Sequence, residues 1–292
     1  MAATGARPPG AQDEASAAEA VRQIFDSIAP RYDLLNHLLS ANVDRLWWRR
    51  AARRFREILA NPESAVLDVC CGTGDMTLAL LKLRPQGARP VLAADFSRGM
   101  LSRAAEKFAT KGFGGPGLGE KTLPERHKVP PYAVPLEADA LHLPLKSASF
   151  DLIVTAFGFR NLANYEAGLK EFHRVLKPGG QLGILEFSEP GGLVGKAYAV
   201  YFRRVLPAIG RSICGSAAGG LMVGSPAAGS PAAGDKSGPY NYLPASVGSF
   251  PPPADLLALM AAAGYEQCAW QPYTFGIAGL YTAVRGAIAG ER

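Results

Sequence analysis

The segment 66–75 constrains the fold most, because an apolar run leads directly into a turn that contains two glycines. Gly72 and Gly74 allow positive φ angles and let a ligand approach the backbone closely. An amphipathic segment over 75–84 follows, and the start of a helix leaves backbone N–H groups facing whatever binds there. The pattern therefore predicts a strand, a tight ligand-binding turn and a helix.

Asp95 narrows the class of ligand. The apolar run 90–95 predicts a second strand that ends at this residue, and a carboxylate there suits a ribose diol because it accepts from both hydroxyls. The turn lacks the third glycine of the G-x-G-x-x-G pattern, and Asp75 at the helix start would repel a pyrophosphate. A cationic sulfonium meets no such objection. The turn thus resembles motif I of the class I S-adenosylmethionine-dependent methyltransferases.

Strands and helices alternate along most of the chain. Apolar runs predict strands over 65–70, 90–95, 133–137, 150–157, 181–187, 265–272 and 277–285, and periodic segments predict helices over 75–84, 98–110, 164–176, 196–213 and 253–263. We expect Ser97 to cap the helix over 98–110. This alternation predicts an α/β fold with a doubly wound, mostly parallel seven-stranded sheet, the Rossmann-like architecture of class I methyltransferases.

The length of 292 residues fits one large domain. Residues 1–21 are rich in Ala, Gly and Pro and are predicted to be a disordered tail, and 22–288 to form the methyltransferase domain. Residues 22–60 look helical and would form an N-terminal cap over the substrate. Two segments are predicted loop insertions, 112–131 and the low-complexity 214–239.

Composition favours a cytoplasmic protein. The hydrophobic content of 48% is ample for a core, yet no apolar run is long enough to span a membrane and no export signal is recognisable. The 4 cysteines contain no C-x-x-C pair and suit a reducing compartment. No metal site is predicted.

Arginines account for much of the uneven positive charge. Six of them crowd the segment 45–56, beside Trp47 and Trp48. One interpretation is a solvated helix face; another is a transient, peripheral contact with anionic lipid at the inner face of the cell membrane. Basic residues do not recur elsewhere as a stripe, so no nucleic-acid partner is expected.

Several longer motifs resemble one family. They are 25–36 (Phe-Asp-Ser-Ile-Ala-Pro-Arg-Tyr-Asp-Leu-Leu-Asn), 156–161 (Ala-Phe-Gly-Phe-Arg-Asn), 174–180, 185–188 and 240–244. Together they are similar to the UbiE/COQ5 methyltransferases, which are the ubiquinone and menaquinone C-methyltransferases. The resemblance implies methyl transfer from S-adenosylmethionine to a ring carbon of a polyprenylated quinol. It also implies that a homodimer is possible.

The resemblance also implies cofactor-binding residues. Thr73 would lie in the cofactor loop, Asp95 on the ribose, and Asp139 with the backbone N–H of Ala140 at the adenine. The remaining expected cofactor residues come from the first strand and its turn: Asp68, Gly72 and Gly74. Bacterial members often carry serine where this chain has Ala156, so Ala156 is left out of the predicted set.

Methylating an aromatic carbon requires electron density on that carbon, which ionisation of a neighbouring hydroxyl supplies. Arg160 and Asn161 follow a predicted strand at the edge of the sheet where ligands bind in such folds. Arginine stays protonated, so we expect Arg160 to stabilise the quinolate rather than act as a base, and Asn161 to orient a hydroxyl or water. The alternative for Arg160 is a salt bridge at a strand end.

The first helical segment offers further candidates. Tyr32 and Asn36 share a face at i, i+4 spacing, and the family resemblance makes both of them predicted substrate-binding residues, with Tyr32 also catalytic. His37 has a suitable unperturbed pKa for a base but could simply pair with Asp33. His173 lies in an apolar helix and is interpreted as structural.

Alternatives to menaquinone synthesis stay open. The motif Asp-Val-Cys-Cys-Gly-Thr-Gly-Asp over 68–75 favours demethylmenaquinol as acceptor, against the benzoquinol precursor of ubiquinone. A different small-molecule methyltransferase, or a cofactor-binding subunit without turnover, are further candidates. The segment 129–132 superficially resembles the motif of DNA and protein N-methyltransferases, but it lacks the amide or acid that holds the target nitrogen.

Overall fold

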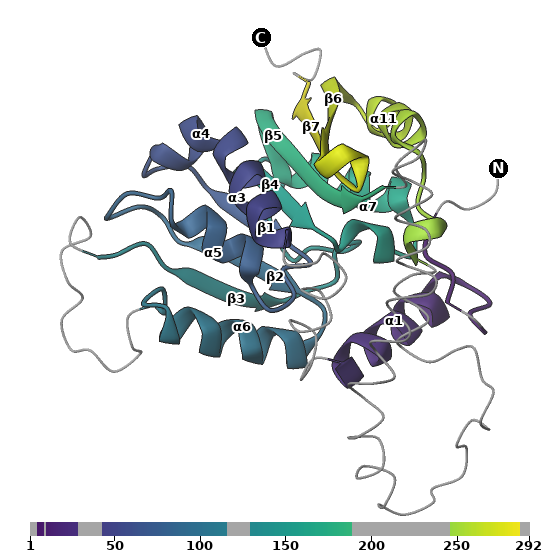
Figure 1. The fold of residues 1–292 in the computed structure, drawn as a ribbon, viewed down its shortest axis with the longest axis horizontal. Helices are drawn as coiled ribbons and strands as arrows, with labels where there is room; N and C mark the ends of the chain where they lie inside the picture. The colour runs from purple at the N-terminus through teal and green to yellow at the C-terminus, as the bar shows by residue number, and fades with distance from the viewer. Residues whose placement is uncertain (1–4, 9, 29–42, 116–128, 189–245, 287–292) are drawn as a thin grey trace, which may run out of the picture.

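A seven-stranded sheet forms the centre of the molecule, in the order β3-β2-β1-β4-β5-β7-β6 (Figure 1). The computed structural model describes residues 5–8, 10–28, 43–115, 129–188 and 246–286. The strands are β1 (Val66–Val69), β2 (Val91–Asp95), β3 (Ala133–Glu137), β4 (Phe150–Ala156), β5 (Leu176–Phe187), β6 (Tyr265–Tyr273) and β7 (Ala278–Arg285). The first five pair in parallel, while β7 is antiparallel to both β5 and β6. This confirms the predicted fold class.

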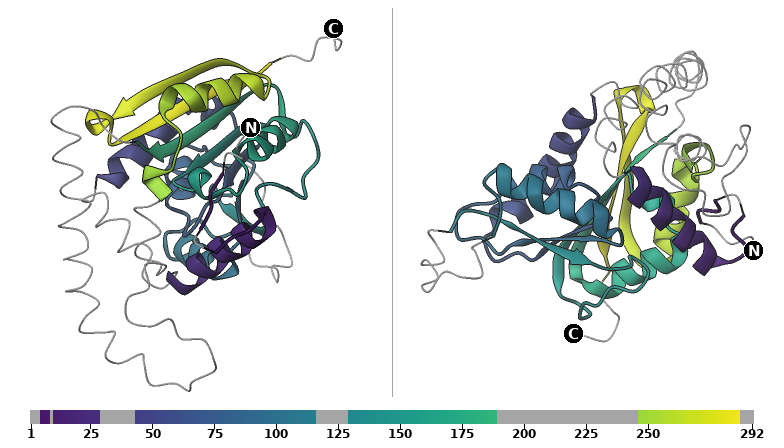
Figure 2. Two further views of the ribbon diagram at one scale, coloured as in Figure 1. Left: turned by 90° about the vertical axis from the view of Figure 1, so that its right-hand side faces the viewer. Right: turned by 90° about the horizontal axis from the view of Figure 1, so that it is seen from below.

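Helices cover both faces of the sheet (Figures 1 and 2). They are α1 (Glu14–Ile28), α3 (Asp44–Arg54), α4 (Arg56–Ala60), α5 (Asp75–Leu81), α6 (Arg98–Thr110), α7 (Tyr165–Val175) and α11 (Pro253–Ala262). Side chains of α3, α4, α5 and α6 enter one hydrophobic cluster, and those of α7 and α11 enter another. The doubly wound arrangement is thus built from two cores that the sheet separates.

Alternation along the central strands explains why both cores form. In β4, Leu152 and Val154 belong to the first cluster, whereas Ile153 between them belongs to the second. In β1, Val66 and Leu67 divide in the same way. Because successive side chains of a strand point to opposite faces, a continuous apolar run is what a strand covered on both faces requires.

The strand order reverses between β1 and β4, since the chain proceeds from β1 outward to β3 and then returns to β4. In open parallel sheets, ligands bind at such a reversal, beyond the carboxyl ends of the strands. The loops that follow β1 and β4 approach each other closely there. A Cβ on Gly158 would lie 2.3 Å from Cβ of Cys70, so only glycine fits at this contact.

The N-terminal region differs from its prediction as a disordered tail over 1–21. Helix α1 begins at Glu14 and buries Ala17 and Val21 against the rest of the protein. Before it, the backbone N–H of Ala6 donates to the carbonyl of Leu162 at 2.8 Å. The prediction was wrong for these residues because their apolar contacts come from distant parts of the chain. Most of the two predicted insertions, and the helix predicted over 196–213, lie outside the described residues.

Trp47 and Trp48 lie in the protein core rather than at its surface, with Trp47 only 1% exposed. The Trp47 ring packs against Phe157 and Phe187, with ring centroids 6.0 and 5.8 Å away. Its Nε1 donates to the hydroxyl of Thr274 at 2.7 Å. The two tryptophan side chains are therefore not available for the lipid contact suggested for this segment, although the arginines of α3 are exposed.

No helix in the described part of the chain is both long and apolar enough to cross a membrane.

Candidate functional site

The turn after β1 adopts the left-handed conformation that its glycines predict. Gly72 and Gly74 have φ angles of 55° and 86°. Cys70 shares this conformation at φ 55°, which is uncommon for a residue with a side chain. A Cβ on Gly74 would come within 2.5 Å of the Phe108 ring, so glycine is also needed for close packing on α6. The turn ends where α5 begins, at Asp75.

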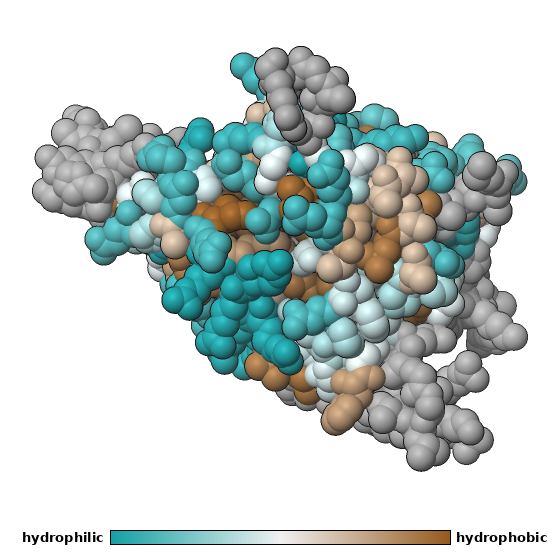
Figure 3. All heavy atoms as spheres, turned by 90° about the horizontal axis from the view of Figure 1, so that it is seen from above, coloured by the Kyte–Doolittle hydropathy of each residue, from teal (hydrophilic) through white to brown (hydrophobic). Residues whose placement is uncertain are grey.

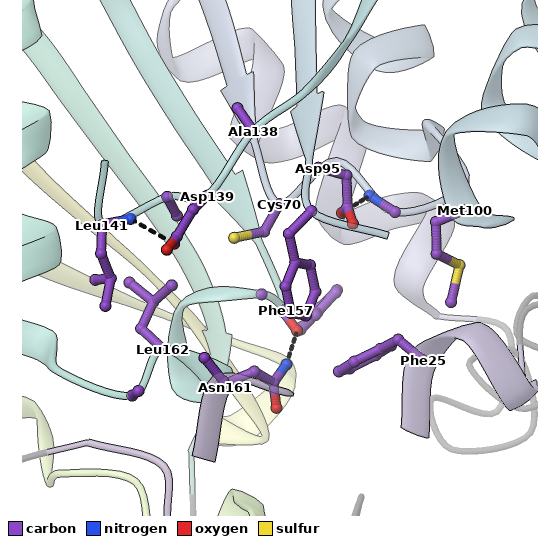
Figure 4. A pocket seen from close by; sticks show the side chains of 16 residues that line it. Phe25, Cys70, Asp95, Met100, Ala138, Asp139, Leu141, Phe157, Asn161 and Leu162 are labelled. Atoms are coloured by element: carbon purple, nitrogen blue, oxygen red, sulfur yellow. Dashed lines mark hydrogen bonds between the residues drawn. The ribbon is translucent and has the colours of Figure 1, made fainter. Parts of the chain in front are cut away.

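Asp95 is buried at the end of β2 and faces this turn (Figure 4). Its Oδ2 accepts from the backbone N–H of Gly72 at 2.8 Å, and its Oδ1 accepts from the N–H of Ser97 at 2.9 Å. Burial, with a smaller contribution from Asp26, raises the pKa of Asp95 to about 6. The backbone therefore orients a carboxylate in the position predicted for ribose recognition.

Ser97 connects this carboxylate to the N-terminal helix. Its hydroxyl accepts from the N–H of Met100 at 3.2 Å, which confirms the predicted N-cap of α6. The same hydroxyl donates to Asp26 of α1. Phe25, the neighbour of Asp26, packs edge-on against Phe96 with a centroid distance of 6.4 Å. Helix α1 is thereby fastened beside the residues that follow β2.

One cavity extends from Asp95 to the loop after β4. Asp139 and Ala140, for which a role at the adenine was predicted, line it, and Asp139 Oδ1 accepts from the N–H of Leu141 at 2.9 Å. Figure 4 shows Asp95 and Asp139 on either side of Cys70. The walls are mostly apolar, and several of them were not predicted: Ala18, Phe25, Phe96, Met100, Leu141 and Leu162. A flat aromatic base with polar edges fits such a cavity.

A second, smaller cavity lies on the other side of the turn, and Asp68, Thr73 and Phe157 line it. Asp68 is 0% exposed. Its Oδ2 accepts from the Thr77 hydroxyl at 2.5 Å, but its Oδ1 has no hydrogen-bond partner among the described residues. Burial raises the pKa of Asp68 to about 7. An unpaired buried carboxylate oxygen is costly, and a ligand ammonium would satisfy it.

The residues present therefore fit S-adenosylmethionine. Its amino-acid tail carries the ammonium that Asp68 lacks, its ribose carries the diol for Asp95, and its adenine matches the apolar cavity at Asp139. The glycines of the turn leave room for a ligand against the backbone.

Thr73 is buried at the tip of the turn and is held by α6. Lys107 donates to the Thr73 hydroxyl at 3.0 Å and to Asp75 at 3.1 Å. Asp75, which would repel an anion, is thus paired with a cation within the protein. The ion pair weakens the repulsion of a pyrophosphate that the sequence suggested for Asp75, so it is the missing third glycine of the turn that disfavours a dinucleotide.

Arg160 does not line either of these cavities. It is 1% exposed, and its Nη1 donates to Glu186 at 2.8 Å and to the carbonyl of Phe157 at 2.6 Å. Glu186 also accepts from the Arg160 backbone N–H at 3.0 Å. The geometry corresponds to the alternative interpretation, a salt bridge at a strand end. Direct contact between Arg160 and the substrate, as predicted, does not fit this placement.

Asn161 lines the larger cavity together with Phe157 and Gly158 (Figure 4). Its Nδ2 donates to the carbonyl of Phe157 at 3.4 Å, and Phe157 itself has a φ of 58°. The same carbonyl accepts from Arg160. The buried ion pair thus braces the loop that presents the Asn161 amide beside the cofactor residues.

Tyr32, Asn36 and His37 lie outside the described residues, so their predicted roles stay predictions. His173 lies 5.2 Å from Tyr265, centroid to centroid, and contacts Gly264, which agrees with a structural role. Within the described ranges, no three His, Cys, Asp or Glu side chains gather as a metal site would require. Sequence reasoning missed Glu186, although the quoted motif 185–188 contains it.

Comparison with known proteins agrees with the geometry. Residues 12–219 and 222–285 match the ubiE/COQ5 methyltransferase family. The chain is 41% identical to the demethylmenaquinone methyltransferase of Deinococcus radiodurans, over 94% of this chain and 96% of that protein. Its identity to the demethylmenaquinone methyltransferase of Thermus thermophilus is also 41%, over 90% of this chain and 100% of that protein. It is 39% identical to the ubiquinone/menaquinone biosynthesis C-methyltransferase UbiE of Geobacter sulfurreducens, over 92% of this chain and 89% of that protein.

Solved structures support the fold. An S-adenosylmethionine-dependent methyltransferase from Aquifex aeolicus aligns with a TM-score of 0.50 at 18% identity, over 80% of this chain and 89% of that one. The [4+2]-cyclase SpnF aligns with a TM-score of 0.51 at 17% identity, over 82% of each chain. A cyclase among these neighbours shows that the fold alone does not fix the chemistry. The family match and the site together do: this chain belongs to the ubiE/COQ5 methyltransferase family and is an S-adenosylmethionine-dependent methyltransferase.

Proposed function

We propose that this enzyme methylates a ring carbon of demethylmenaquinol, a polyprenylated naphthoquinol, and so completes a menaquinone. Two relatives at 41% identity are named demethylmenaquinone methyltransferases. The observation that carries the proposal is that one cavity is lined both by the proposed cofactor residues Asp95 and Asp139 and by Asn161. An acceptor beside Asn161 would therefore be adjacent to the methyl donor.

S-adenosylmethionine supplies an electrophilic methyl group on its sulfonium. Asp68, Asp95 and Asp139 would bind its ammonium, ribose and adenine, with Thr73, Gly72 and Gly74 shaping the turn. Asn161 would orient a ring hydroxyl, or a water next to it. Loss of the proton of that hydroxyl would place electron density on the neighbouring ring carbon, which would be the nucleophile for the methyl group, and the bond from methyl to sulfur would break as the new carbon–carbon bond forms. The ring carbon then loses its own proton, and aromaticity is restored.

Arg160 acts in this proposal as a positioning residue. Its charge is balanced by Glu186, and both groups brace the backbone at Phe157 and Asn161. Tyr32 and Asn36 remain proposed pocket residues, with Tyr32 a candidate to assist the quinolate.

The direct test is incubation of the purified protein with methyl-labelled S-adenosylmethionine and a short-chain demethylmenaquinol under reducing conditions. We expect label on a ring carbon of the naphthoquinol, identified by mass spectrometry and NMR. Label on an oxygen, or none despite cofactor binding, would contradict the proposal; the second result would favour a cofactor-binding subunit without turnover. Asn161→Ala should retain cofactor binding and lower turnover by roughly 10²-fold, as expected for one lost orienting group.

The benzoquinol precursor of ubiquinone is the second candidate acceptor, because one relative at 39% identity is named for both quinones. A short-chain methoxybenzoquinol in the same assay separates the two. Preference for the naphthoquinol supports our proposal, and preference for the benzoquinol reverses it.

A polyprenylated acceptor resides in a bilayer, so we propose a cytoplasmic enzyme that contacts the inner face of the cell membrane peripherally. A homodimer is proposed from the family resemblance alone, and no nucleic-acid partner is expected. Light scattering coupled to gel filtration measures the oligomeric state directly.

A further inference from the structure

The turn between β6 and β7 carries the most exposed large apolar side chain among the described residues. Phe275 is 82% exposed, compared with 50% for Leu46 and 39% for Val134. Transfer of so much aromatic surface from water is favourable wherever an apolar phase is in reach. Its exposure is therefore a feature to explain.

The backbone holds Phe275 outward. Thr274, Phe275 and Gly276 have consecutive φ angles of 46°, 58° and 87°, a conformation that residues with side chains rarely adopt. Both ends of the turn are fastened: Trp47 donates to the Thr274 hydroxyl at 2.7 Å, and the Ser188 hydroxyl donates to the Gly276 carbonyl at 2.6 Å. The turn thus presents a fixed aromatic tip rather than a loose loop.

This tip lies at the carboxyl edge of the sheet, where the proposed function places the substrate. Phe187, the last residue of β5, pairs with Ala278, so the turn projects just beyond the end of β5. Glu186 and Ser188 on either side of Phe187 connect the tip to the loop of Arg160 and Asn161. A molecule that enters the site from this side passes close to the tip.

Helix α3 adds positive charge and a second apolar side chain beside the tip. Arg50 lies over the Tyr273 ring at 4.7 Å from its centroid, and Leu46 is one helical turn earlier, next to Trp47. On the adjoining face of α3, an open groove is lined by basic side chains with Asp75 as the single acid: Arg45, Arg49, Arg53, Lys82, Lys107 and Lys111. Figure 3 shows strongly hydrophilic side chains next to apolar ones along the lower border of that view.

We propose that Phe275 and Leu46 enter the headgroup layer of an anionic phospholipid bilayer, with the exposed arginines of α3 on the lipid phosphates. The combination of apolar tips and cationic surroundings is that of a peripheral membrane contact. The occupant follows from charge complementarity and from the position at the substrate edge. This inference rests on the proposed function, because a prenylated acceptor gives the contact its purpose. In it, Phe275 is the aromatic residue that contacts the lipid, since Trp47 and Trp48 are buried.

The first experiment is flotation of the full chain with vesicles of phosphatidylglycerol and phosphatidylcholine. We expect Phe275→Ala to lower the partition coefficient about tenfold, since most of the benzyl group leaves the apolar layer. Arg45→Glu combined with Arg49→Glu should lower the partition coefficient further and reduce its salt dependence. Val134→Ala is the matched control, because Val134 is exposed on β3 at the opposite edge of the sheet. Partition unchanged in Phe275→Ala, or equally reduced in Val134→Ala, would overturn the proposal.

A fluorescent reporter gives an independent test. Emission of Phe275→Trp, after subtraction of the natural tryptophans, should shift to the blue on these vesicles and be quenched by brominated acyl chains; Val134→Trp should show neither effect. A blue-shifted emission without vesicles would mean that another part of the chain, or a second copy, covers the tip, and the proposal would be wrong.

Methyl transfer to a soluble and to a membrane-embedded acceptor separates the membrane contact from the proposed function. Methyl transfer to a short-chain acceptor in vesicle-free buffer should be the same for Phe275→Ala and wild type, while transfer to a long-chain acceptor embedded in vesicles should fall in the variant. A wild type that binds vesicles but methylates neither acceptor contradicts the function alone. Equal transfer to the embedded acceptor by both proteins contradicts the membrane contact alone.

Discussion

Arg160 and Glu186 form an ion pair that is almost entirely removed from water, with side-chain exposures of 1% and 0%. Two buried charges are tolerable only when each satisfies the other and the remaining donors and acceptors are paired. Here the Phe157 carbonyl and the Ser246 hydroxyl also accept from Arg160, and the backbone N–H groups of Arg160 and Phe187 donate to Glu186. Either residue on its own would be an uncompensated buried charge.

We therefore expect Arg160→Ala and Glu186→Gln each to lower the free energy of unfolding by about 3–5 kcal/mol. Lys177→Ala is the control, because its ion pair with Asp151 is about one-third exposed and should contribute no more than about 1 kcal/mol. Urea unfolding followed by circular dichroism measures both. An Arg160→Ala protein of normal stability that loses turnover would instead make Arg160 a group that contacts the substrate.

The two cofactor carboxylates predict how stability depends on pH. Burial raises the pKa of Asp95 to about 6 and that of Asp68 to about 7, above their values in the unfolded chain. Between pH 4 and 7 the folded state then binds more protons than the unfolded state, so the contribution of these residues to stability falls as pH rises. In urea unfolding of the cofactor-free proteins, the free energy of unfolding should fall more steeply with rising pH for the wild type than for Asp68→Asn or Asp95→Asn. Identical slopes in all three proteins would contradict the raised pKa values.

Helix α1 is an element whose position depends on a few distant contacts. Phe25 and Ala18 line the cofactor cavity, and Asp26 accepts from the Ser97 hydroxyl across 71 residues of sequence. Helix α1 therefore forms one wall of the proposed cofactor site in addition to leading into the proposed substrate cap. Its contribution should be visible in cofactor affinity, separate from methyl transfer.

We expect Phe25→Ala to weaken S-adenosylhomocysteine binding by about ten- to a hundredfold, because a large apolar wall of the cavity is removed. Gln23→Ala is the matched control: Gln23 is exposed on the same helix, and its side-chain amide donates to Glu19 at 2.9 Å. Isothermal titration calorimetry gives both affinities. If both variants bind as the wild type does, α1 is not part of the cofactor site.

The elements show which features a sequence can predict. Strands and the glycine turn follow from local patterns, since a two-sided apolar run and two glycines at fixed spacing specify β1 and its turn without distant information. The ion pair of Arg160 with Glu186 does not follow from a local pattern, because the two residues come together through the pairing of Ala156 with Leu185 in neighbouring strands. The burial of Trp47 depends in the same way on the β6–β7 turn. The sequence therefore identifies the glycine turn, which depends on neighbouring residues only. It does not predict the surroundings of Arg160 and Trp47, because their partners lie far away in the chain.

At the scale of the whole molecule, the sheet places the proposed cofactor and acceptor residues at the ends of neighbouring strands. β1, β2 and the segment after β3 supply Asp68, Asp95 and Asp139, whereas the turn after β4 supplies Asn161 and Arg160, and β5 supplies Glu186. Both sets meet where the strand order reverses, between β1 and β4. Occupation of the cofactor half should therefore stabilise the whole domain.

Cofactor binding links this geometry to thermal stability. A ligand at a concentration of 100 times its Kd stabilises a protein by about 2.7 kcal/mol, which for a domain of this size raises Tm by roughly 5–10 °C. We expect S-adenosylhomocysteine to do so, and to do so more strongly at pH 8 than at pH 5.5, because the pKa values of Asp95 and Asp68 lie between those limits. Differential scanning fluorimetry measures the shift.

A matched pair of ligands separates the two carboxylates. Methylthioadenosine keeps the ribose and adenine of S-adenosylhomocysteine but lacks the amino-acid tail, so it cannot reach the unpaired Oδ1 of Asp68. Asp68→Asn should therefore reduce the Tm shift produced by S-adenosylhomocysteine and leave that of methylthioadenosine unchanged, whereas Asp95→Asn should reduce both. Equal losses for the two ligands in Asp68→Asn would place the ammonium elsewhere, because a carboxylate that binds only the tail cannot affect a ligand without one.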